Sequence, residues 1–412
     1  MFYPEKGKKY VRIRKNHRNY QEEMLKKRWI KTAVILVIVV ALVGAGVFFR
    51  VPQKLATAAV NVYGQLQSGK KVTKKEPKAA TEPEQEEVVE EPEEEVIEPA
   101  TLIFTGDVEL STYVQANYDA SGIDGVTSAA LRKELKAADI AAVNNEFAFS
   151  ERGTAADKQY TFRVAPHYVS ALNELGIDVA GLANNHSLDY GQDALLDTIQ
   201  TLNDAGIDNT GAGNSMDEAA RLVVKEIDGI RYGFLACSRV IPYASWDVRN
   251  VQPGLFTCYD PSELIARTQA AKEQCDYLFV LVHWGIEHTT QLEAYQSQIG
   301  QAVIDAGADA VIGAHPHVLQ GIEYYNGKPI FYSLGNFIFN QDIDQTAIVK
   351  VTADPEAGLS FSLIPAYARN ATTRLASETE AAGYDKTEEI LNTLRELSPN
   401  VEIDENGNMS ER

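Results

Sequence analysis

Residues 277–288 have the sequence YLFVLVHWGIEH, in which an unbroken apolar run ends abruptly in histidine, tryptophan and glutamate. The run from 277 to 282 does not alternate between apolar and polar residues, which is typical of a strand covered on both faces of its sheet. The residues that follow lie at the carboxyl end of that strand, where α/β folds place their ligands. This stretch therefore predicts an α/β fold with a polar site at a strand end.

Five further segments share this design, in which an apolar run ends in polar residues that can bind a metal. They are Thr-Gly-Asp at 105–107, Asn-Asn-Glu at 144–146, Ala-Asn-Asn-His at 183–186, Gly-Ala-His-Pro-His at 313–317 and Ser-Leu-Gly-Asn at 333–336. The six segments together contain five of the chain's seven histidines, namely His186, His283, His288, His315 and His317. Because histidines placed at random would scatter, this clustering predicts that the strand ends meet at one site.

Apolar periodicity predicts that strands and helices alternate from residue 101 onward. Helices are expected near 127–138, 166–175, 192–205, 261–274, 292–306 and 386–397, and strands at 101–105, 140–143, 178–182, 222–227, 231–236, 277–282, 310–313 and 330–333. Gly176, Gly206 and Gly307 are each expected to end a helix in left-handed backbone. Asp228-Gly229 is a turn sequence that predicts a hairpin between the two strands beside it.

The net charge of −20 over 412 residues hides a strong asymmetry. Residues 1–78 contain 18 Lys or Arg and 4 Asp or Glu, whereas residues 79–412 contain 20 and 54. An acidic body without a basic stripe argues against nucleic-acid binding, because nothing would displace the counterions of the phosphates.

The cysteines, Cys237, Cys258 and Cys275, are odd in number and widely spaced, which predicts buried free thiols instead of a disulfide framework.

Residues 32–49 (TAVILVIVVALVGAGVFF) contain no charged side chain. As a helix, this run would nearly span a hydrocarbon layer about 30 Å thick. Four basic residues lie between positions 26 and 31, so the positive-inside rule places residues 1–31 in the cytoplasm. The long charged leader favours an uncleaved signal anchor over a cleaved signal peptide. We therefore expect a single-pass protein of the cell membrane with an extracellular main domain.

Residues 50–100 are expected to form a disordered tether. Residues 82–98 contain ten glutamates and two prolines, and like charges with so few apolar residues cannot form a core. The predicted organisation has five parts: a basic leader at 1–31, a membrane helix at 32–49, the tether at 50–100, a main domain at 101–370, and a C-terminal segment at 371–412 with one helix and a disordered acidic end.

The polar segments offer carboxylates, an amide oxygen and imidazoles, but no thiolate. That donor set suits Mn, Fe or Zn, and could fill one six-coordinate site or two linked sites. His315 and His317 are the most specific pair, because alternate residues of an extended segment can aim two imidazoles at one centre when the chain kinks. Pro316 between them fixes a backbone angle.

These segments resemble the CapA-like family of poly-γ-glutamate capsule biosynthesis proteins over residues 101–340. The strings that carry the resemblance are TGDV at 105–108, NE at 145–146, LANNHSLDYG at 182–191, HWGIE at 283–287, GAHPHV at 313–318 and YSLGNF at 332–337. That family in turn resembles calcineurin-like metallophosphoesterases, so the resemblance implies a four-layer α/β/β/α sandwich with a metal site. The single membrane anchor before an outside domain is also similar to members of the family.

Carried over residue by residue, the resemblance implies which side chains would hold the metal. His186 would lie near the leaving group, as an acid or as a charge stabiliser. The implied ligands are Asp107, Glu146, Asn185, His283, His315 and His317. Three positions depart from the phosphoesterase pattern. Glu109 replaces the histidine of Asp-x-His, Glu146 replaces a bridging aspartate, and Asn184 replaces the glycine of Gly-Asn-His. The resemblance therefore leaves one metal position without an assigned set of ligands. The fold alone does not imply phosphatase activity.

Four further residues are weaker candidates. Glu287 follows His283 by four positions and would either support a ligating imidazole, as a second catalytic residue, or be a surface glutamate. Arg163 would clamp an anionic substrate or lie unengaged on the surface, and Asn336 would cap or orient the site. His288 is expected to be a neighbour of the site and not a ligand.

Three functions remain open from the sequence. The first is a membrane-anchored extracellular factor that makes, exports or anchors an anionic polymer, which the resemblance implies is poly-γ-glutamate. The second is a metal-dependent hydrolase of a surface phosphoester or amide. The third is a non-enzymatic subunit whose membrane helix contacts a polymer synthase. The expected partners are therefore the polymer or its precursor, the membrane and synthase subunits.

Overall fold

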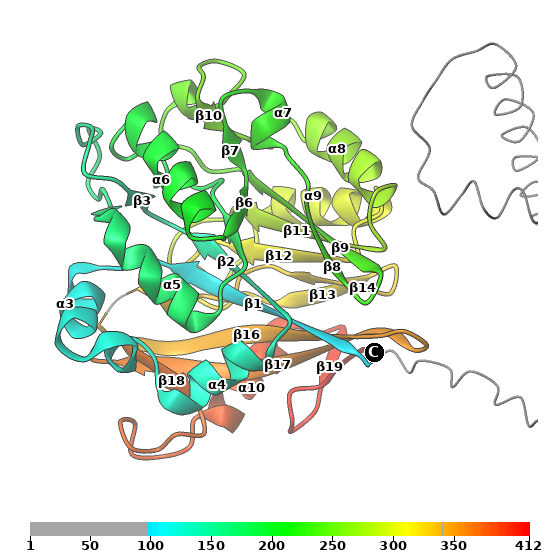
Figure 1. Cartoon of the computed structure of the whole chain (residues 1–412). Helices are drawn as coiled ribbons and strands as arrows, with labels where there is room; N and C mark the ends of the chain where they lie inside the picture. Colours follow the sequence, from blue (N-terminus) through cyan, green and yellow to red (C-terminus); the bar gives the residue numbers. More distant parts are fainter. Residues whose placement is uncertain (1–97, 340) are drawn as a thin grey trace, which may run out of the picture. The chain divides into compact units, whose positions relative to one another are not determined.

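The computed structural model describes residues 98–339 and 341–412. The predicted leader, membrane helix and nearly all of the tether lie outside these residues. Within them, no helix combines the length and apolar character that crossing a membrane requires. The described residues form a mixed α/β sandwich (Figure 1).

The first sheet has eight strands, with β1 (Ala100–Val108) near its middle. Its order is β18-β17-β16-β1-β2-β5-β6, and β15 pairs with the carboxyl end of β1. Strands β2, β5, β6 and β15 join it in parallel pairs, and β16 to β18 continue it in antiparallel pairs. The bounds are β2 (Ile140–Asn145), β5 (Val179–Gly181), β6 (Asp208–Thr210), β15 (Asn336–Ile338), β16 (Ile343–Asp354), β17 (Gly358–Arg369) and β18 (Thr372–Leu375).

The second sheet has six strands in the order β13-β14-β12-β11-β9-β8. Its four inner strands are parallel, and both edge strands are antiparallel to their neighbours. The bounds are β8 (Val223–Ile227), β9 (Ile230–Ser238), β11 (Tyr277–His283), β12 (Ala310–Ala314), β13 (Ile322–Tyr325) and β14 (Lys328–Phe331). The hairpin predicted at Asp228-Gly229 is confirmed as β8–β9.

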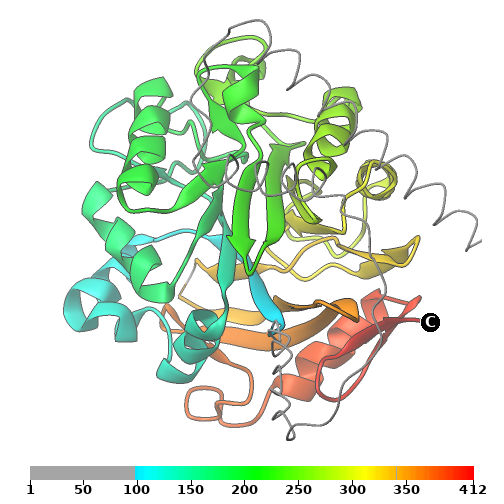
Figure 2. The same cartoon turned by 45° about the vertical axis from the view of Figure 1, so that its right-hand side comes forward.

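Helices flank both sheets (Figures 1 and 2). They are α3 (Thr112–Ser121), α4 (Ala129–Ala137), α5 (Val169–Leu175), α6 (Gln192–Asp204), α7 (Met216–Ala219), α8 (Ser262–Lys272), α9 (Ala294–Asp305) and α10 (Thr387–Leu397). Short pairs β3–β4 (Ala148–Phe149, Arg163–Val164) and β7–β10 (Ala212–Gly213, Gly254–Leu255) lie in the connections. Each helix predicted from periodicity is present, and the left-handed glycines that end three of them are confirmed at Gly176, Gly206 and Gly307, with φ of 79°, 79° and 116°.

Alternate residues of the strands divide the core into layers. Phe104 of β1 and Phe279 of β11 project between the two sheets, and their ring centroids lie 4.9 Å apart. Ile103 instead packs with the apolar residues of α4, α5 and α6 on the outer side of the first sheet. Leu278 and Val280 pack with those of α8 and α9. Both sheets are thus covered on two faces, as the unbroken apolar run at 277–282 predicts.

Two parts of the C-terminal third differ from expectation. The long antiparallel hairpin β16–β17 was not predicted, although residues 347, 349, 351 and 353 alternate as apolar positions that face the core. The disordered acidic end expected after α10 is wrong: β19 (Val401–Ile403) and β20 (Met409–Glu411) form a hairpin, and Ser362 of β17 bridges to Asn408. This segment is ordered because Val401 and Ile403 are buried in the core between the sheets.

Cys237, Cys258 and Cys275 are buried free thiols, as predicted.

Candidate metal centre

The site lies where the carboxyl ends of strands from both sheets meet. In the first sheet, Asp107 of β1 is in register with Asn144 of β2 on one side and with Asn336 of β15 on the other. A Cβ on Gly106 would lie 1.9 Å from the Gly335 carbonyl oxygen, so glycine is required for this close approach. From the second sheet, β11 ends at His283. The sequence prediction that the strand ends converge is therefore confirmed for these segments.

Glu146, His315 and His317 form the tightest group of potential ligands in the part of the chain that the structure describes. One ligand atom from each lies within 4.8 Å of the other two. Both carboxylate oxygens of Glu146 and Nδ1 of His315 are buried without a hydrogen-bond partner. Because buried polar atoms without partners cost free energy, their presence together indicates that something else satisfies them. Carboxylate and imidazole donors at this spacing fit a divalent metal ion.

Asp107 holds the segment that carries the two histidines. Its carboxylate accepts the backbone N–H of His315 at 3.2 and 3.3 Å, and it lies 3.3 Å from His317 Nδ1. His315 and His317 both have left-handed backbone, with φ of 99° and 59°. Non-glycine residues in that region are strained and persist where the surroundings enforce them. The carboxylate of Asp107 therefore enforces a turn that presents both imidazoles.

His283 is fixed by amide groups from the first sheet. Its Nε2 lies 2.7 Å from Asn185 Oδ1 and 3.5 Å from Glu146 Oε1, and its Nδ1 lies 3.3 Å from the Asn144 amide nitrogen. Asn144 also donates to Asp107 at 2.8 Å. The structure thus brings together all six residues that were predicted as metal ligands.

Burial and neighbouring charges set the protonation of the three imidazoles. Burial, reinforced by the other imidazoles, lowers the pKa of His283 well below its usual value and lowers that of His315 to about 3. Burial opposes the charge of His317 too, but Glu146 and Asp107 outweigh it and raise the pKa of His317 to about 10. Burial, followed by repulsion from Asp107, raises the pKa of Glu146 well above its usual value. His283 and His315 are therefore neutral, as metal binding requires, whereas a metal ion would have to displace a proton from His317 and from Glu146.

Comparison with known proteins identifies the family of this domain. Residues 101–341 match the family model described as "Bacterial capsule synthesis protein PGA_cap". That region is more than half of the chain. The chain belongs to the PGA_cap family.

Three relatives share the PGA_cap region. The PGA biosynthesis protein CapA of Bacillus subtilis is 32% identical over 246 residues, which cover 59% of this chain and 64% of that relative. The capsule biosynthesis protein CapA of Bacillus anthracis is 31% identical over 257 residues, or 60% of this chain and 62% of that relative. A probable polyglutamine synthesis accessory protein of Mycobacterium tuberculosis is 29% identical over 286 residues, or 64% and 74%. The chain thus spans somewhat less than two thirds of the first two relatives.

Beside the ligand group, this PGA_cap domain carries a cluster that sequence reasoning missed. His186 Nδ1 lies 2.7 Å from Asp189 Oδ2, and Lys158 Nζ lies 2.7 Å from Asp189 Oδ1. Lys158 also donates to the Asn185 carbonyl oxygen at 2.6 Å, and the backbone N–H of Phe162 donates to Asp189 at 2.7 Å. The ring of His186 stacks on that of Phe162, 4.3 Å away. Asp189 belongs to the string LANNHSLDYG at 182–191, whereas Lys158 lies outside every string that carries the resemblance.

Two predicted site residues lie apart from the ligands. Glu287 is exposed in a turn after β11, and the ring nitrogens of His283 contact Asn185 and Asn144 in its place, so the prediction that Glu287 supports that imidazole is wrong. A spacing of four residues does not align side chains once a strand has ended. Arg163 is exposed and its guanidinium stacks on Tyr190 at 4.2 Å, so its substrate-binding role stays a prediction.

Asn336 and His288 lie on the outer side of the centre. Asn336 Oδ1 lies 2.8 Å from His317 Nδ1, which orients that imidazole. The ring of His288 lies 6.0 Å from that of His317, consistent with a neighbour. His288, His317 and Asn336 all line a pocket of about 400 Å³, together with Asp342, Asp344 and other residues. Of the predicted ligands, His317 lines this pocket, which therefore leads from the surface to that imidazole.

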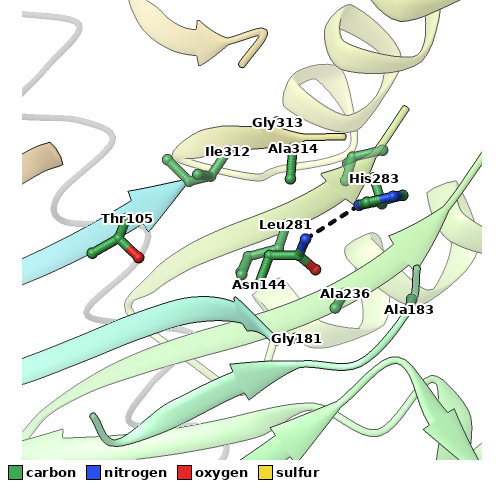
Figure 3. Close-up of a pocket in the computed structure, with 11 residues that line it drawn as sticks. Thr105, Asn144, Gly181, Ala183, Ala236, Leu281, His283, Ile312, Gly313 and Ala314 are labelled. Atoms are coloured by element: carbon green, nitrogen blue, oxygen red, sulfur yellow. Dashed lines mark hydrogen bonds between the residues drawn. The ribbon is translucent and has the colours of Figure 1, made fainter. Parts of the chain in front are cut away.

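A second, much smaller cavity lies between the sheets. It is lined by Asn144 and His283 together with mainly apolar or small residues such as Leu281, and the bond between Asn144 and His283 crosses it (Figure 3). Its accessible volume of about 10 Å³ has room for roughly one water. The small inner cavity thus lies on the core side of His283, and the larger pocket lies on the outer side of His317.

Proposed function

We propose that this protein is a membrane-anchored extracellular factor in the biosynthesis, export or anchoring of poly-γ-glutamate, and that a divalent metal at the strand ends is required for that role. The family and the printed names of the relatives support the polymer class. The observation that carries the metal is Glu146, whose two buried oxygens lack partners beside His315 and His317. The sandwich and its ligand order also support a metallophosphoesterase-like, four-layer arrangement.

Membrane anchoring belongs to the same proposal. The uncharged run at 32–49 follows a basic leader, and the acidic tether then separates the run from the domain. Protease added to intact cells should remove the domain and leave the leader protected. A protected domain would contradict the orientation and, with it, the role at the cell surface.

Within this proposal, each group of the centre has a distinct task. Asp107, Glu146, Asn185, His283, His315 and His317 would hold one or two ions of Mn, Fe or Zn. The bound ion would supply positive charge that stabilises negative charge developing on a substrate. Asn336 holds the imidazole of His317 from the pocket side. The pocket beside His317 would take the carboxylate-bearing polymer or its precursor.

A second candidate function, a metal-dependent hydrolase, is favoured by one observation. Nδ1 of His186 is engaged by Asp189, which leaves Nε2 as the nitrogen that can give or take a proton at a substrate. The ammonium group of Lys158 neutralises the carboxylate of Asp189, so the pair adds no net charge beside His186. Turnover of model phosphodiesters by the purified protein, abolished by His186→Ala, would support the hydrolase; turnover that His186→Ala leaves unchanged would contradict it.

The metal proposal is tested by comparing two neighbouring histidines. His317→Ala removes an imidazole at the centre of the ligand group, whereas His288→Ala removes an exposed imidazole whose ring lies 6.0 Å away. In the full chain purified without chelator, His317→Ala and His283→Ala should lower first-row metal content, and His288→Ala should not. In cells, His317→Ala should abolish surface polymer.

Two outcomes would overturn the proposal. One is a wild-type protein that contains no first-row metal. The other is full metal content in both His317→Ala and His283→Ala. In either case the chain would be a scaffold whose membrane helix contacts synthase subunits.

A further inference from the structure

Arg239 is a cation beside the end of β11 for which neither the sequence patterns nor the proposed ligand group gives a role. It directly follows β9, which pairs with β11 so that Ser238 lies beside His283. The backbone N–H of Arg239 donates to the His283 carbonyl oxygen at 2.7 Å. Arg239 therefore stands at the same carboxyl edge of the second sheet as the predicted ligand His283.

The guanidinium group of Arg239 is held against two tyrosine rings. Its central carbon lies 4.0 Å from the ring centroid of Tyr259 and 4.7 Å from that of Tyr295. Each ring is fixed by its own hydroxyl, because Tyr259 accepts the Ile241 N–H at 3.1 Å and Tyr295 accepts the Gly285 N–H at 2.9 Å. Aromatic faces attract the cation and orient its plane, and they leave the N–H groups at the edge of that plane to donate elsewhere.

No carboxylate neutralises Arg239 within the part of the chain that the structure describes. Its half-buried guanidinium makes no hydrogen bond and no ion pair there. Several other arginines pair with an aspartate, namely Arg231, Arg249, Arg267 and Arg369. Residues 79–412 contain 54 Asp or Glu against 20 Lys or Arg, so counterions are abundant. An arginine that is held in place without one of them can take its counterion from a ligand.

The segment that begins at Arg239 runs along the proposed ligand group. Its hydroxyl-bearing Tyr243 donates to the Asp157 carbonyl oxygen, and the ring of Trp246 lies 5.5 Å from Lys158 Nζ. Lys158 donates in turn to the carbonyl oxygen of Asn185, a predicted ligand. The segment thus starts at the His283 backbone and ends beside the neighbours of Asn185. An elongated ligand that reaches the metal can therefore also reach Arg239.

We propose that Arg239, held by Tyr259 and Tyr295, is a subsite that binds carboxylates of the polymer beside the metal centre. Poly-γ-glutamate keeps one free carboxylate on every residue, because the linkage consumes the side-chain carboxyl. A chain that places one carboxylate at the metal offers its next carboxylates to the surroundings. The planar guanidinium can hold one of these through two parallel N–H donors. The inference rests on the proposed function and names a residue by which an acidic domain retains a polyanion.

The test measures how tightly the full chain, purified in detergent and loaded with Mn²⁺, binds a fluorescent γ-linked oligoglutamate by fluorescence anisotropy. Arg239→Gln should weaken binding about 10-fold, because it removes a charge-assisted pair. Arg239→Lys keeps the charge but not the planar fork, and should weaken binding less. Arg231→Gln is the matched control. It removes the same charge near the opposite end of β9, where Arg231 pairs with Asp276, and should bind like wild type.

A second probe tests the chemistry of the ligand. An oligomer whose carboxylates are replaced by carboxamides should bind wild type and Arg239→Gln equally weakly. Since the Arg239 side chain makes no hydrogen bond in the fold, Arg239→Gln should still melt cooperatively.

The outcomes separate this inference from the proposed function. Equal affinity of wild type and Arg239→Gln for the charged oligomer would overturn the subsite, and the metal centre would stand if chelation still weakened that binding. An equal weakening in Arg231→Gln would also overturn it, because net charge would then attract the polymer. No binding of the charged oligomer by wild type would overturn both the subsite and the polymer as a ligand of this domain.

Discussion

Two buried clusters at the same strand ends differ in how their charges are satisfied. In the cluster of Lys158, Asp189 and His186, the two oxygens of Asp189 accept bonds from Lys158, from His186 and from the Phe162 N–H. In the adjacent cluster, the two oxygens of Glu146 accept no bond from the described residues, and Nδ1 of His315 has no partner there either. Every buried charge of the first cluster has a partner in the chain. The second cluster contains buried polar atoms that the described residues leave without a partner. The contrast separates residues that hold the site together from residues that bind a ligand.

The largest effect should come from breaking the complete cluster. Asp189→Asn leaves the ammonium of Lys158, whose side chain is 15% exposed, without its carboxylate. Breaking a buried pair in this way should lower the free energy of unfolding by about 3–5 kcal/mol. Chemical denaturation of metal-free protein measures this. A loss below about 1 kcal/mol would show that the cluster is not structural.

A change of opposite sign is expected in the incomplete cluster. Glu146→Gln replaces a buried carboxyl without partners, whose raised pKa makes the folded chain hold a proton that the unfolded chain releases, so the metal-free chain should gain about 1–3 kcal/mol of stability. The same variant should lose the bound metal and its stabilisation. Denaturation with and without Mn²⁺ measures both effects. A metal-free variant less stable than wild type would show that Glu146 has a structural partner.

The smallest expected effect is a pH dependence of the metal-free chain. The pKa of Glu109, about 8, and that of His317, about 10, both exceed their usual values, so the folded state holds protons that the unfolded state has released. Stability should therefore fall as pH rises from about 6.5 through 8. Melting temperatures across this range measure it, and Glu109→Gln should make the decline shallower. A decline of equal slope in that variant would mean that Glu109 does not titrate in this range.

Local sequence patterns predicted most of the elements that place the site. The run at 277–282 became β11, with its apolar residues divided between the two faces of the sheet. The family resemblance implied the ligand set. The six residues could lie together because each stands at or shortly after the end of a strand, and parallel strands end at the same edge. The hairpin β16–β17 was not predicted, although residues 347–353 alternate in the way that indicates a strand. The last residues form a hairpin and are not disordered, because Val401 and Ile403 are buried against strands that are distant in the sequence.

The sequence by itself determined which residues stand at strand ends and which donor types they bring, because strand periodicity and turn chemistry are local. Only the tertiary structure decided which of these groups have partners. Lys158 meets Asp189 across 31 positions, and His283 meets Asn185 across 98. Glu287, close to His283 in sequence, is exposed, while Glu146 is fully buried. Whether a carboxylate is a surface charge, a structural anchor or a ligand depends on its burial and on its neighbours, and both are set by contacts between distant parts of the chain.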